Sequence, residues 1–130
     1  MYHISKQSFI QHLITINESN LNVLTVSELL NNKKNNTISL TFDDGWAGAF
    51  NIAMPTLIEF GYRCTYFITK DFVGREGFID EKKIIMAAEA GMEIGGHGTT
   101  HRMLSNCSKD EIIWEFANCK EYLESLTGQK

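Results

Sequence analysis

Segments with the period of a strand alternate with segments with the period of a helix along most of this 130-residue chain. Short β-branched or alternating runs predict strands over Thr37–Phe42, Cys64–Ile68 and Met92–Gly95. Helical patterns follow each of them, over residues 50–61, 81–90 and 108–127. Three strand-then-helix units in a row predict parallel strands joined by crossover helices. The sequence therefore predicts an α/β fold.

Capping signals mark where several helices begin. Ser5 can cap a first helix, and Thr25–Glu28 is a capping box that opens a short helix with Leu29 and Leu30 directed inward. A second capping box, Ser108–Glu111, leads the longest helical pattern. The apolar positions expected to share one face of that last helix are Ile112, Phe116, Cys119, Leu123 and Leu126.

Charge and hydropathy exclude several classes of protein. Lysine plus arginine number 12 and aspartate plus glutamate 16, so the net charge is −4. A chain without a basic surface is not expected to bind nucleic acid. Apolar runs do not exceed about five residues, whereas a spanning helix needs about twenty, so no membrane span is predicted. Cys64, Cys107 and Cys119 are odd in number without CxxC spacing, and we expect them to be packed thiols.

The amino-terminal residues bear on location. Met1–Lys6 lacks the charged start and apolar core of a secretory signal. We therefore expect a cytoplasmic protein, or an extracytoplasmic one if an N-terminal signal was removed from this sequence.

Two adjacent carboxylates, Asp43 and Asp44, follow the first predicted strand and precede Gly45. Asp-Gly after an alternating strand also indicates a hairpin turn, although a helical pattern follows here instead of a second strand. One carboxylate can bind a cation while its neighbour takes a proton, and like charges so close are costly without a positive group between them. Chemistry gathers at the carboxyl ends of parallel strands, so both interpretations stay open at this point.

His97 and His101 follow the third predicted strand, four residues apart. Two imidazoles at this spacing can reach one divalent ion, although coincidence also accounts for the pair in a chain with four histidines. His3 and His12 lie far away in sequence and are assigned to structure or surface. A carboxylate after the first strand and a histidine pair after the third fall on the same edge of a parallel sheet. Together they form the ligand set of a hydrolytic zinc site with an open position for water.

The same residues carry a resemblance to a known family. Thr41–Trp46 (TFDDGW) resembles the TFDDG motif of the polysaccharide deacetylases, the NodB homology domain. His97–His101 resembles that family's second motif: a histidine, a serine or threonine, two variable residues and a histidine. Between them, the resemblance includes Pro55–Leu57, Gly61, Thr65–Ile68 and Ala90–Gly95. It extends over residues 37–130.

The resemblance implies a distorted, TIM-like (β/α) barrel that hydrolyses N-acetyl, sometimes O-acetyl, groups on sugars, usually N-acetylglucosamine units. Asp44, His97 and His101 match the metal ligands of this carbohydrate esterase family, and Asp43 matches its general base. The implied cofactor is a divalent metal: Zn²⁺ is expected first, with Co²⁺, Ni²⁺ and Mn²⁺ as alternatives. The implied partner is an acetylated sugar or polysaccharide. Trp46 could border the sugar, with core packing as the equal alternative.

Gly98 departs from the family pattern, because the family usually has serine or threonine there, with a hydroxyl that braces the loop. Thr99 or Thr100 can substitute for that hydroxyl.

The chain is also short for this family. It holds about three βα units, whereas barrels of this kind need about 200 residues or more. The family's later motifs, among them a histidine acid and an oxyanion-hole tyrosine, would follow a helix such as Ser108–Thr127. We therefore expect one truncated domain over residues 1–130, with its motifs in residues 37–130, forming a partial (β/α) barrel. An open edge strand and an uncovered inner face favour pairing, so we expect a homo-oligomer that covers the open half-barrel.

Two functional hypotheses follow. The first is a metal-dependent carbohydrate deacetylase, or the N-terminal half of one. The second is a catalytically incomplete metal-binding half-barrel that acts as an assembly module. A metallohydrolase that acts on another amide is a weaker alternative, because these motifs specify water activation more than the leaving group.

Overall fold

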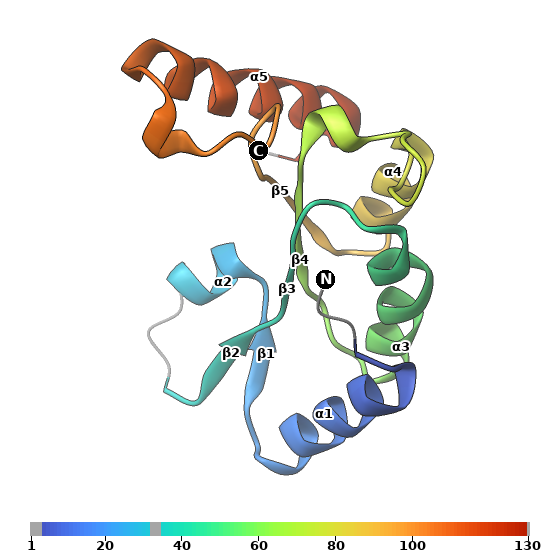
Figure 1. Ribbon diagram of the computed structural model, residues 1–130. Helices are drawn as coiled ribbons and strands as arrows, with labels where there is room; N and C mark the ends of the chain where they lie inside the picture. The colour runs from blue at the N-terminus through green and yellow to red at the C-terminus, as the bar shows by residue number, and fades with distance from the viewer. Residues whose placement is uncertain (1–3, 32–34, 130) are drawn as a thin grey trace.

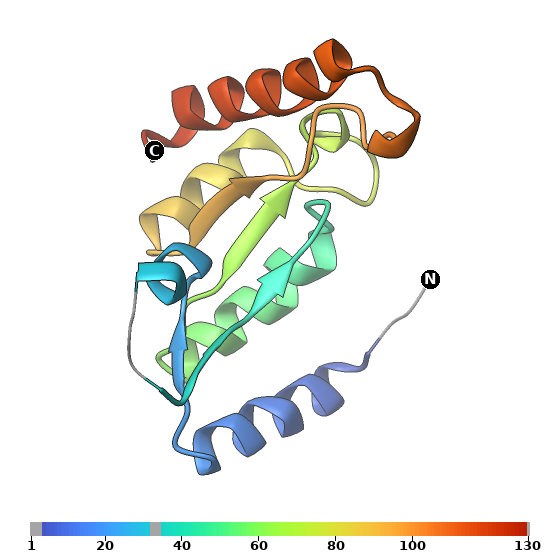
Figure 2. The ribbon, with the colours of Figure 1, turned by 90° about the vertical axis from the view of Figure 1, so that its left-hand side faces the viewer.

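The computed structural model describes residues 4–31 and 35–129. Three short parallel strands, in the order β3-β4-β5, form its main sheet. Their bounds are β3 Thr41–Phe42, β4 Thr65–Ile68 and β5 Glu93–Gly96. Figure 2 shows the three strands side by side and pointing the same way, so that the loops after them leave the sheet along one edge. The parallel pairing predicted from the sequence is confirmed.

Helices cover one face of this sheet. α3 (Met54–Glu59) and α4 (Glu81–Glu89) belong to the crossover connections between successive strands, and both lie on the same side of the sheet (Figure 1). α1 (Lys6–Glu18) lies beyond β3, and α5 (Lys109–Thr127) lies beyond β5 (Figure 2). This arrangement is part of the wall of a (β/α) barrel, as the sequence predicts, and the described strands do not close into a ring.

The stretch Thr37–Phe42, expected to be one strand, is divided at Leu40. Its first half, β2 (Thr37–Ser39), pairs in parallel with β1 (Asn22–Leu24), whereas its second half is β3 and pairs with β4. The chain thus changes its pairing partner at Leu40, and the two halves of the stretch belong to different sheets. A strand as short as β1 is too short to show a period of two, so the sequence pattern does not indicate it.

Side-chain caps begin the helices where the sequence predicts them. The Ser8 N–H donates to Ser5 Oγ at 3.0 Å at the start of α1. Ser108 and Glu111 form a reciprocal capping box at the start of α5. The remaining helical elements are α2 (Val26–Asn31), the π-helical segment η1 (Ala49–Ala53) and two 3₁₀ turns, η2 (Lys70–Phe72) and η3 (Leu104–Asn106).

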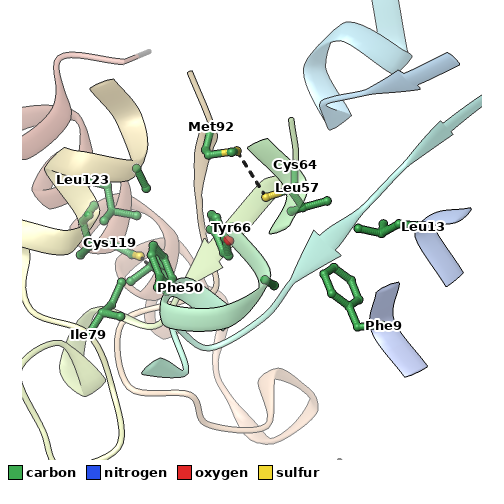
Figure 3. Packing of buried hydrophobic residues seen from close by; sticks show 14 residues of the cluster. Phe9, Leu13, Phe50, Leu57, Cys64, Tyr66, Ile79, Met92, Cys119 and Leu123 are labelled. Carbon is green, nitrogen blue, oxygen red and sulfur yellow. Dashed lines mark hydrogen bonds between the residues drawn. The ribbon is translucent and has the colours of Figure 1, made fainter. Parts of the chain in front are cut away.

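The hydrophobic core lies between the sheet and its helices (Figure 3). Tyr66 and Ile68 of the central strand β4 are fully buried on one side of it, because alternate side chains of a strand point to opposite faces. The Phe50 ring stacks on Tyr66 with the ring centroids 4.0 Å apart. Other buried apolar residues are Phe9, Leu13, Leu57, Ile79, Ile84, Ala87, Met92 and Leu123. This core holds β4 in place, and with it the loops on either side.

Cys64 and Cys119 are buried in this core, Cys107 is half-buried, and all three thiols are free. Burial raises the pKa of Cys64 to about 12 and also raises the pKa of Cys119. Because the thiolate is the reactive form of cysteine, these two side chains are inert near neutral pH. The predicted role as packed thiols is confirmed for Cys64 and Cys119.

Two apolar side chains lie differently from the sequence prediction. Leu30 of α2, expected to point inward, is 80% exposed. Phe116 of α5, expected on the buried face, is 51% exposed, and the buried stripe consists of Glu115, Cys119 and Leu123. The apolar pattern of α5 therefore places Cys119 and Leu123 correctly, but it wrongly includes Phe116 and does not show that Glu115 is buried.

The sheet face opposite α3 and α4 is open along α5. A groove of about 670 Å³ lies there, with Phe67 and Gly95 on its sheet side and Ile113 and Phe116 on its helix side. This groove lies on the side of the sheet where the sequence predicts an open inner face. Its coverage by a second copy of the chain stays a prediction.

Gln129 covers part of the outer edge of β5. Its side chain accepts a hydrogen bond from the Ile94 N–H and donates one to the Met92 carbonyl, both at 3.0 Å. These two backbone groups are therefore not available for pairing with another strand. In the part of the chain that the structure describes, no helix is both long and apolar enough to span a membrane.

Glu93, at the start of β5, fixes the beginning of α2 at the amino end of the sheet. Its carboxylate accepts hydrogen bonds from the Ser27 N–H at 3.3 Å and from the hydroxyls of Ser27 and Thr65. The Val26 N–H donates to Thr65 Oγ1 at 2.9 Å. Burial alone would raise the pKa of Glu93, but the hydrogen bonds from Ser27 and Thr65 outweigh it and hold the pKa below its usual value.

We expect Glu93 to make the free energy of unfolding fall in acid. Because its pKa is lower in the folded state than the unfolded value of 4.5, its contribution is complete above that pH and is lost as the pH falls through the folded-state pKa. Urea unfolding from about pH 7 to about pH 3 measures this. Glu93→Gln should show a flatter profile in acid, and Glu89→Gln, at an exposed position, should follow the wild type. Identical profiles for Glu93→Gln and wild type would contradict the assignment.

Candidate metal centre

The candidate site residues lie along the carboxyl edge of the main sheet. Asp43 and Asp44 follow β3 directly, and His97 follows β5 directly. His101 lies four residues further along the same loop. Parallel strands end at one edge, so residues that are more than fifty positions apart in the sequence come together there. The turn after Asp44 leads into η1 and not into a hairpin strand.

Asp44, His97 and His101 meet through their polar atoms. Asp44 Oδ1 lies 3.2 Å from His97 Nδ1 and 3.0 Å from His101 Nε2. One ligand atom from each of the three residues lies within 4.8 Å of the others. The two imidazole rings stack with their centroids 5.3 Å apart. The structure therefore brings together the carboxylate and the two imidazoles that the sequence singled out.

The geometry of this cluster fits a divalent metal. His97 Nδ1 is buried and has no hydrogen-bond partner within the described ranges, even though Asp44 Oδ1 is 3.2 Å away. Such an orphaned buried nitrogen needs an explanation, and a lone pair directed at a shared cation supplies one. The donor set, one carboxylate and two imidazoles, suits Zn²⁺ and leaves a position for water. The side chains of Asp44 and His101 are 20% and 43% exposed, so solvent reaches the site.

Two of the three residues have a strained backbone. Asp44 has a φ of 67° and His101 a φ of 61°, both in the left-handed region. Residues other than glycine adopt this region at a cost of about 1–2 kcal/mol, although aspartate and histidine tolerate it better than most. Such strain persists only where the surroundings hold the chain in place, and it is frequent at functional sites.

Thr69, which the sequence analysis did not identify, supports Asp44 from the neighbouring strand. It follows β4, is fully buried, and its hydroxyl lies 3.5 Å from Asp44 Oδ1, at the limit of a hydrogen bond. The rule that chemistry gathers at the carboxyl ends of parallel strands points to this position as well. Thr69 is thus a buried polar neighbour of the carboxylate that faces both histidines.

Asp43 and His12 lie outside the cluster of three. Asp43 is exposed beside Asp44, and its side chain makes no hydrogen bond with any other described residue. His12 is exposed on α1, as the sequence predicts for a surface residue, and His3 lies outside the described residues. The carboxylate of Asp43 is therefore accessible to solvent at the edge of the site.

Trp46 begins a row of aromatic rings that reaches the cluster. It is 37% exposed and stacks on Phe78 with the centroids 4.3 Å apart. The ring centroids of Phe78 and Phe72 are 4.6 Å apart, and those of Phe72 and His101 are 5.3 Å apart. One face of Trp46 is packed, and part of its surface stays open to solvent. Phe72 and Phe78 carry no recognisable motif, and only the folded chain places them here.

Gly98 has a φ of 82°, and a Cβ built on it would lie 3.3 Å from Glu115 Oε2. We expect Gly98→Ala to lower the free energy of unfolding by about 2–3 kcal/mol, because it combines backbone strain with this close contact. Gly74→Ala is the matched control: its φ is 79° with nothing within 4 Å, so only the strain, about 1–2 kcal/mol, applies. Urea unfolding of the metal-free chains measures both. Equal losses would show that the contact with Glu115 is unimportant.

Comparisons with known proteins agree on one family. The family model for polysaccharide deacetylase matches residues 30–130. A curated relative, the "putative polysaccharide deacetylase YxkH" of Bacillus subtilis (strain 168), is 24% identical over 133 residues, which cover 98% of this chain and 48% of the relative. The chain thus spans about half the length of this curated relative.

Solved structures match the fold. The Streptococcus pyogenes deacetylase PplD, in complex with acetate, superposes with a TM-score of 0.89 at 23% identity, over 97% of this chain and 59% of that one. BC0361, a polysaccharide deacetylase from Bacillus cereus, superposes with a TM-score of 0.86 at 26% identity, over 99% of this chain and 45% of that one. The partial barrel described above has the same fold as the matching parts of both proteins.

Proposed function

The chain belongs to the polysaccharide deacetylase family, and from this premise we propose that it carries the metal site of a hydrolase that removes N-acetyl groups from N-acetylglucosamine-type carbohydrates. The observation that supports this most strongly is the meeting of Asp44, His97 and His101 beside a second, accessible carboxylate, Asp43. The chain spans about half of its curated relative, so we propose the substrate and the reaction from the site itself.

The proposed site holds its metal through Asp44, His97 and His101. Imidazole and carboxylate donors suit Zn²⁺ first and accept Co²⁺, Ni²⁺ or Mn²⁺ as alternatives. When bound, such an ion acidifies water and polarises the acetyl carbonyl group. The Thr69 hydroxyl, 3.5 Å from Asp44 Oδ1, is a further polar neighbour of this carboxylate.

Asp43 is the proposed general base. Its carboxylate is exposed next to Asp44, so it can accept a proton from the water that attacks the acetyl carbon. Asp44 faces both imidazoles and is not available for that task. The two adjacent aspartates thus take different roles because their side chains have different surroundings.

Acetate release is the direct test of this function. A zinc-loaded preparation is incubated with acetylated chito-oligomers, and the acetate is quantified alongside the bound metal. Release of acetate that depends on the metal supports the deacetylase function.

The second candidate, an assembly module with an incomplete site, is favoured by the open groove beside the exposed Phe116. Stoichiometric zinc without acetate release, together with self-association in sedimentation velocity, would support that candidate instead.

We expect Trp46 to contribute to sugar binding. Its exposed surface at the end of the aromatic row can pack against a sugar ring, which is worth about 1 kcal/mol, or about a fivefold change in affinity. Calorimetric titration of Trp46→Ala with an acetylated chito-oligomer measures this loss. Trp114→Ala, at a 48% exposed position on α5, is the matched control and should bind like the wild type. Equal affinities for the two variants would contradict this role.

A further inference from the structure

Glu115 is a buried carboxylate on α5 that none of the assignments above uses. Only 1% of its surface is exposed, and it occupies the buried stripe of the helix together with Cys119 and Leu123. A buried charge is costly unless hydrogen bonds and ion pairs compensate for it. The partners of this carboxylate therefore indicate what it does in the fold.

Among the described residues, the partners of the Glu115 side chain all lie in the loop that carries the two histidines. Its Oε2 accepts hydrogen bonds from the Thr99 N–H at 2.7 Å and the Thr100 N–H at 2.8 Å. Its Oε1 accepts from the Thr100 hydroxyl and lies 3.3 Å from Arg102 Nε. The Thr99 hydroxyl donates to the main-chain oxygen of Glu115 at 2.9 Å. One residue of α5 thus holds the segment between His97 and His101 through both its side chain and its backbone.

These bonds determine the charge state of Glu115. Burial would raise its pKa, but the hydrogen bonds from Thr100 and Thr99 and the charge of Arg102 outweigh burial and hold the pKa below its usual value. Arg102 also reaches Glu111, one turn earlier on α5, with its Nη1 at 3.1 Å from Glu111 Oε1. The carboxylate is therefore ionised near neutral pH and accepts hydrogen bonds at both oxygens.

The opposite side of the loop is held by backbone hydrogen bonds. The His97 N–H donates to the Ile68 carbonyl at 2.8 Å. The N–H groups of Lys70 and Asp71 donate to the carbonyls of Gly98 and Thr99, at 3.2 and 2.9 Å. These contacts fix the beginning of the loop, next to His97. The end of the loop, next to His101 with its left-handed backbone, is held by Glu115.

We propose that Glu115 is a positioning residue of the metal centre: it fixes the Thr99–Arg102 segment so that the His101 imidazole meets Asp44 and His97. The carboxylate does not itself contact the cluster and acts through Thr99 and Thr100. The threonines take the place of the hydroxyl that Gly98 lacks, and they do so by binding a carboxylate from a different element. This inference rests on the proposed metal site.

The informative variant is Glu115→Gln, which keeps the size of the side chain. Its amide has one acceptor oxygen and one NH₂ donor, so either the two N–H groups or the Thr100 and Arg102 donors lose their acceptor. Glu121→Gln is the matched control, because it makes the same change of charge at an exposed position on the same helix. The two variants separate positioning of the loop from any general effect of charge on metal binding.

Zinc affinity of the folded, metal-stripped chains is measured by competition with a chromogenic chelator. The absorption spectrum of the Co²⁺-loaded chains reports the coordination geometry. We expect Glu115→Gln to bind zinc about 10- to 100-fold more weakly and to alter the cobalt spectrum, with Glu121→Gln like the wild type. A purely structural role would lower the free energy of unfolding and leave the zinc affinity and the cobalt spectrum unchanged. That result would overturn the proposal.

Thr100→Val provides a second route if Glu115→Gln does not fold. It removes the hydroxyl that donates to Glu115 Oε1 and accepts from Arg102 Nε at 3.1 Å, and it keeps both backbone hydrogen bonds to Glu115. We therefore expect a smaller loss of zinc affinity, about three- to tenfold. Unchanged affinity in a folded Thr100→Val chain would count against the proposal. A wild-type chain that binds no zinc would instead refute the proposed function, so the two failures are distinguishable.

Discussion

Zinc binding is expected to disappear when His97 and His101 are both replaced with alanine. Each side chain presents a nitrogen to the same Asp44 oxygen, so the double variant leaves one of the three protein ligands. One carboxylate near the surface does not hold zinc against dialysis. Metal analysis after dialysis should find about one zinc per wild-type chain and less than about a tenth of that in the variant.

A change in stability accompanies this loss. Zinc that binds only the folded chain raises the free energy of unfolding of the wild type and should leave the double variant unaffected. His12→Ala is the matched control, since His12 is an exposed histidine on α1, and it should retain its zinc and the stabilisation that zinc brings. Equal zinc content in the double variant and the wild type would remove the proposed metal site.

Asp43→Asn is expected to abolish hydrolysis and to spare the metal. An asparagine side chain cannot accept the proton from the attacking water, and general-base catalysis is worth about 10²–10⁴ in rate. Asp43 does not belong to the cluster of Asp44, His97 and His101, so the zinc content should stay at the wild-type level. Acetate release from acetylated chito-oligomers, measured at equal zinc content, gives the ratio of the two rates.

Asp110→Asn controls for the lost charge in that experiment. Asp110 is exposed in the first turn of α5, and its replacement should not affect acetate release. An Asp43→Asn chain that releases acetate at the wild-type rate would exclude Asp43 as the base. A chain that has lost both its zinc and its activity would instead make Asp43 part of the metal site.

The prediction of the three metal-binding candidates from the sequence rested on two local patterns and one general rule. The TFDDG and His-x-x-x-His motifs identify the residues, and the parallel-sheet rule places the ends of β3 and β5 on the same edge. The structure brings Asp44, His97 and His101 within one ligand sphere, in agreement with that rule. Their role as metal ligands stays a prediction, as does the role of Asp43 as the base.

The supporting residues were beyond the reach of the sequence patterns. Glu115 interrupts the apolar series of α5 and looks like a solvent-exposed charge, yet it is among the most buried residues of the chain. The same pattern placed Cys119 and Leu123 correctly, but it put Phe116 inside, where the structure has it half exposed. A helical period indicates which face of a helix is apolar, and only the neighbouring elements decide how wide the buried stripe is and whether a charged side chain lies in it.

The sequence by itself determined the elements of this protein and the kind of chemistry at their ends, because hydrophobic period, caps and ligand type are local properties. The tertiary structure decided how the Thr37–Phe42 stretch divides between two sheets and that Glu115, and not Phe116, belongs to the buried stripe of α5. It also decided that this carboxylate from α5 holds the loop between the two histidines. These features depend on contacts between segments that are distant along the chain. Such contacts form only when the sheet and its helices pack together, so no local pattern specifies them.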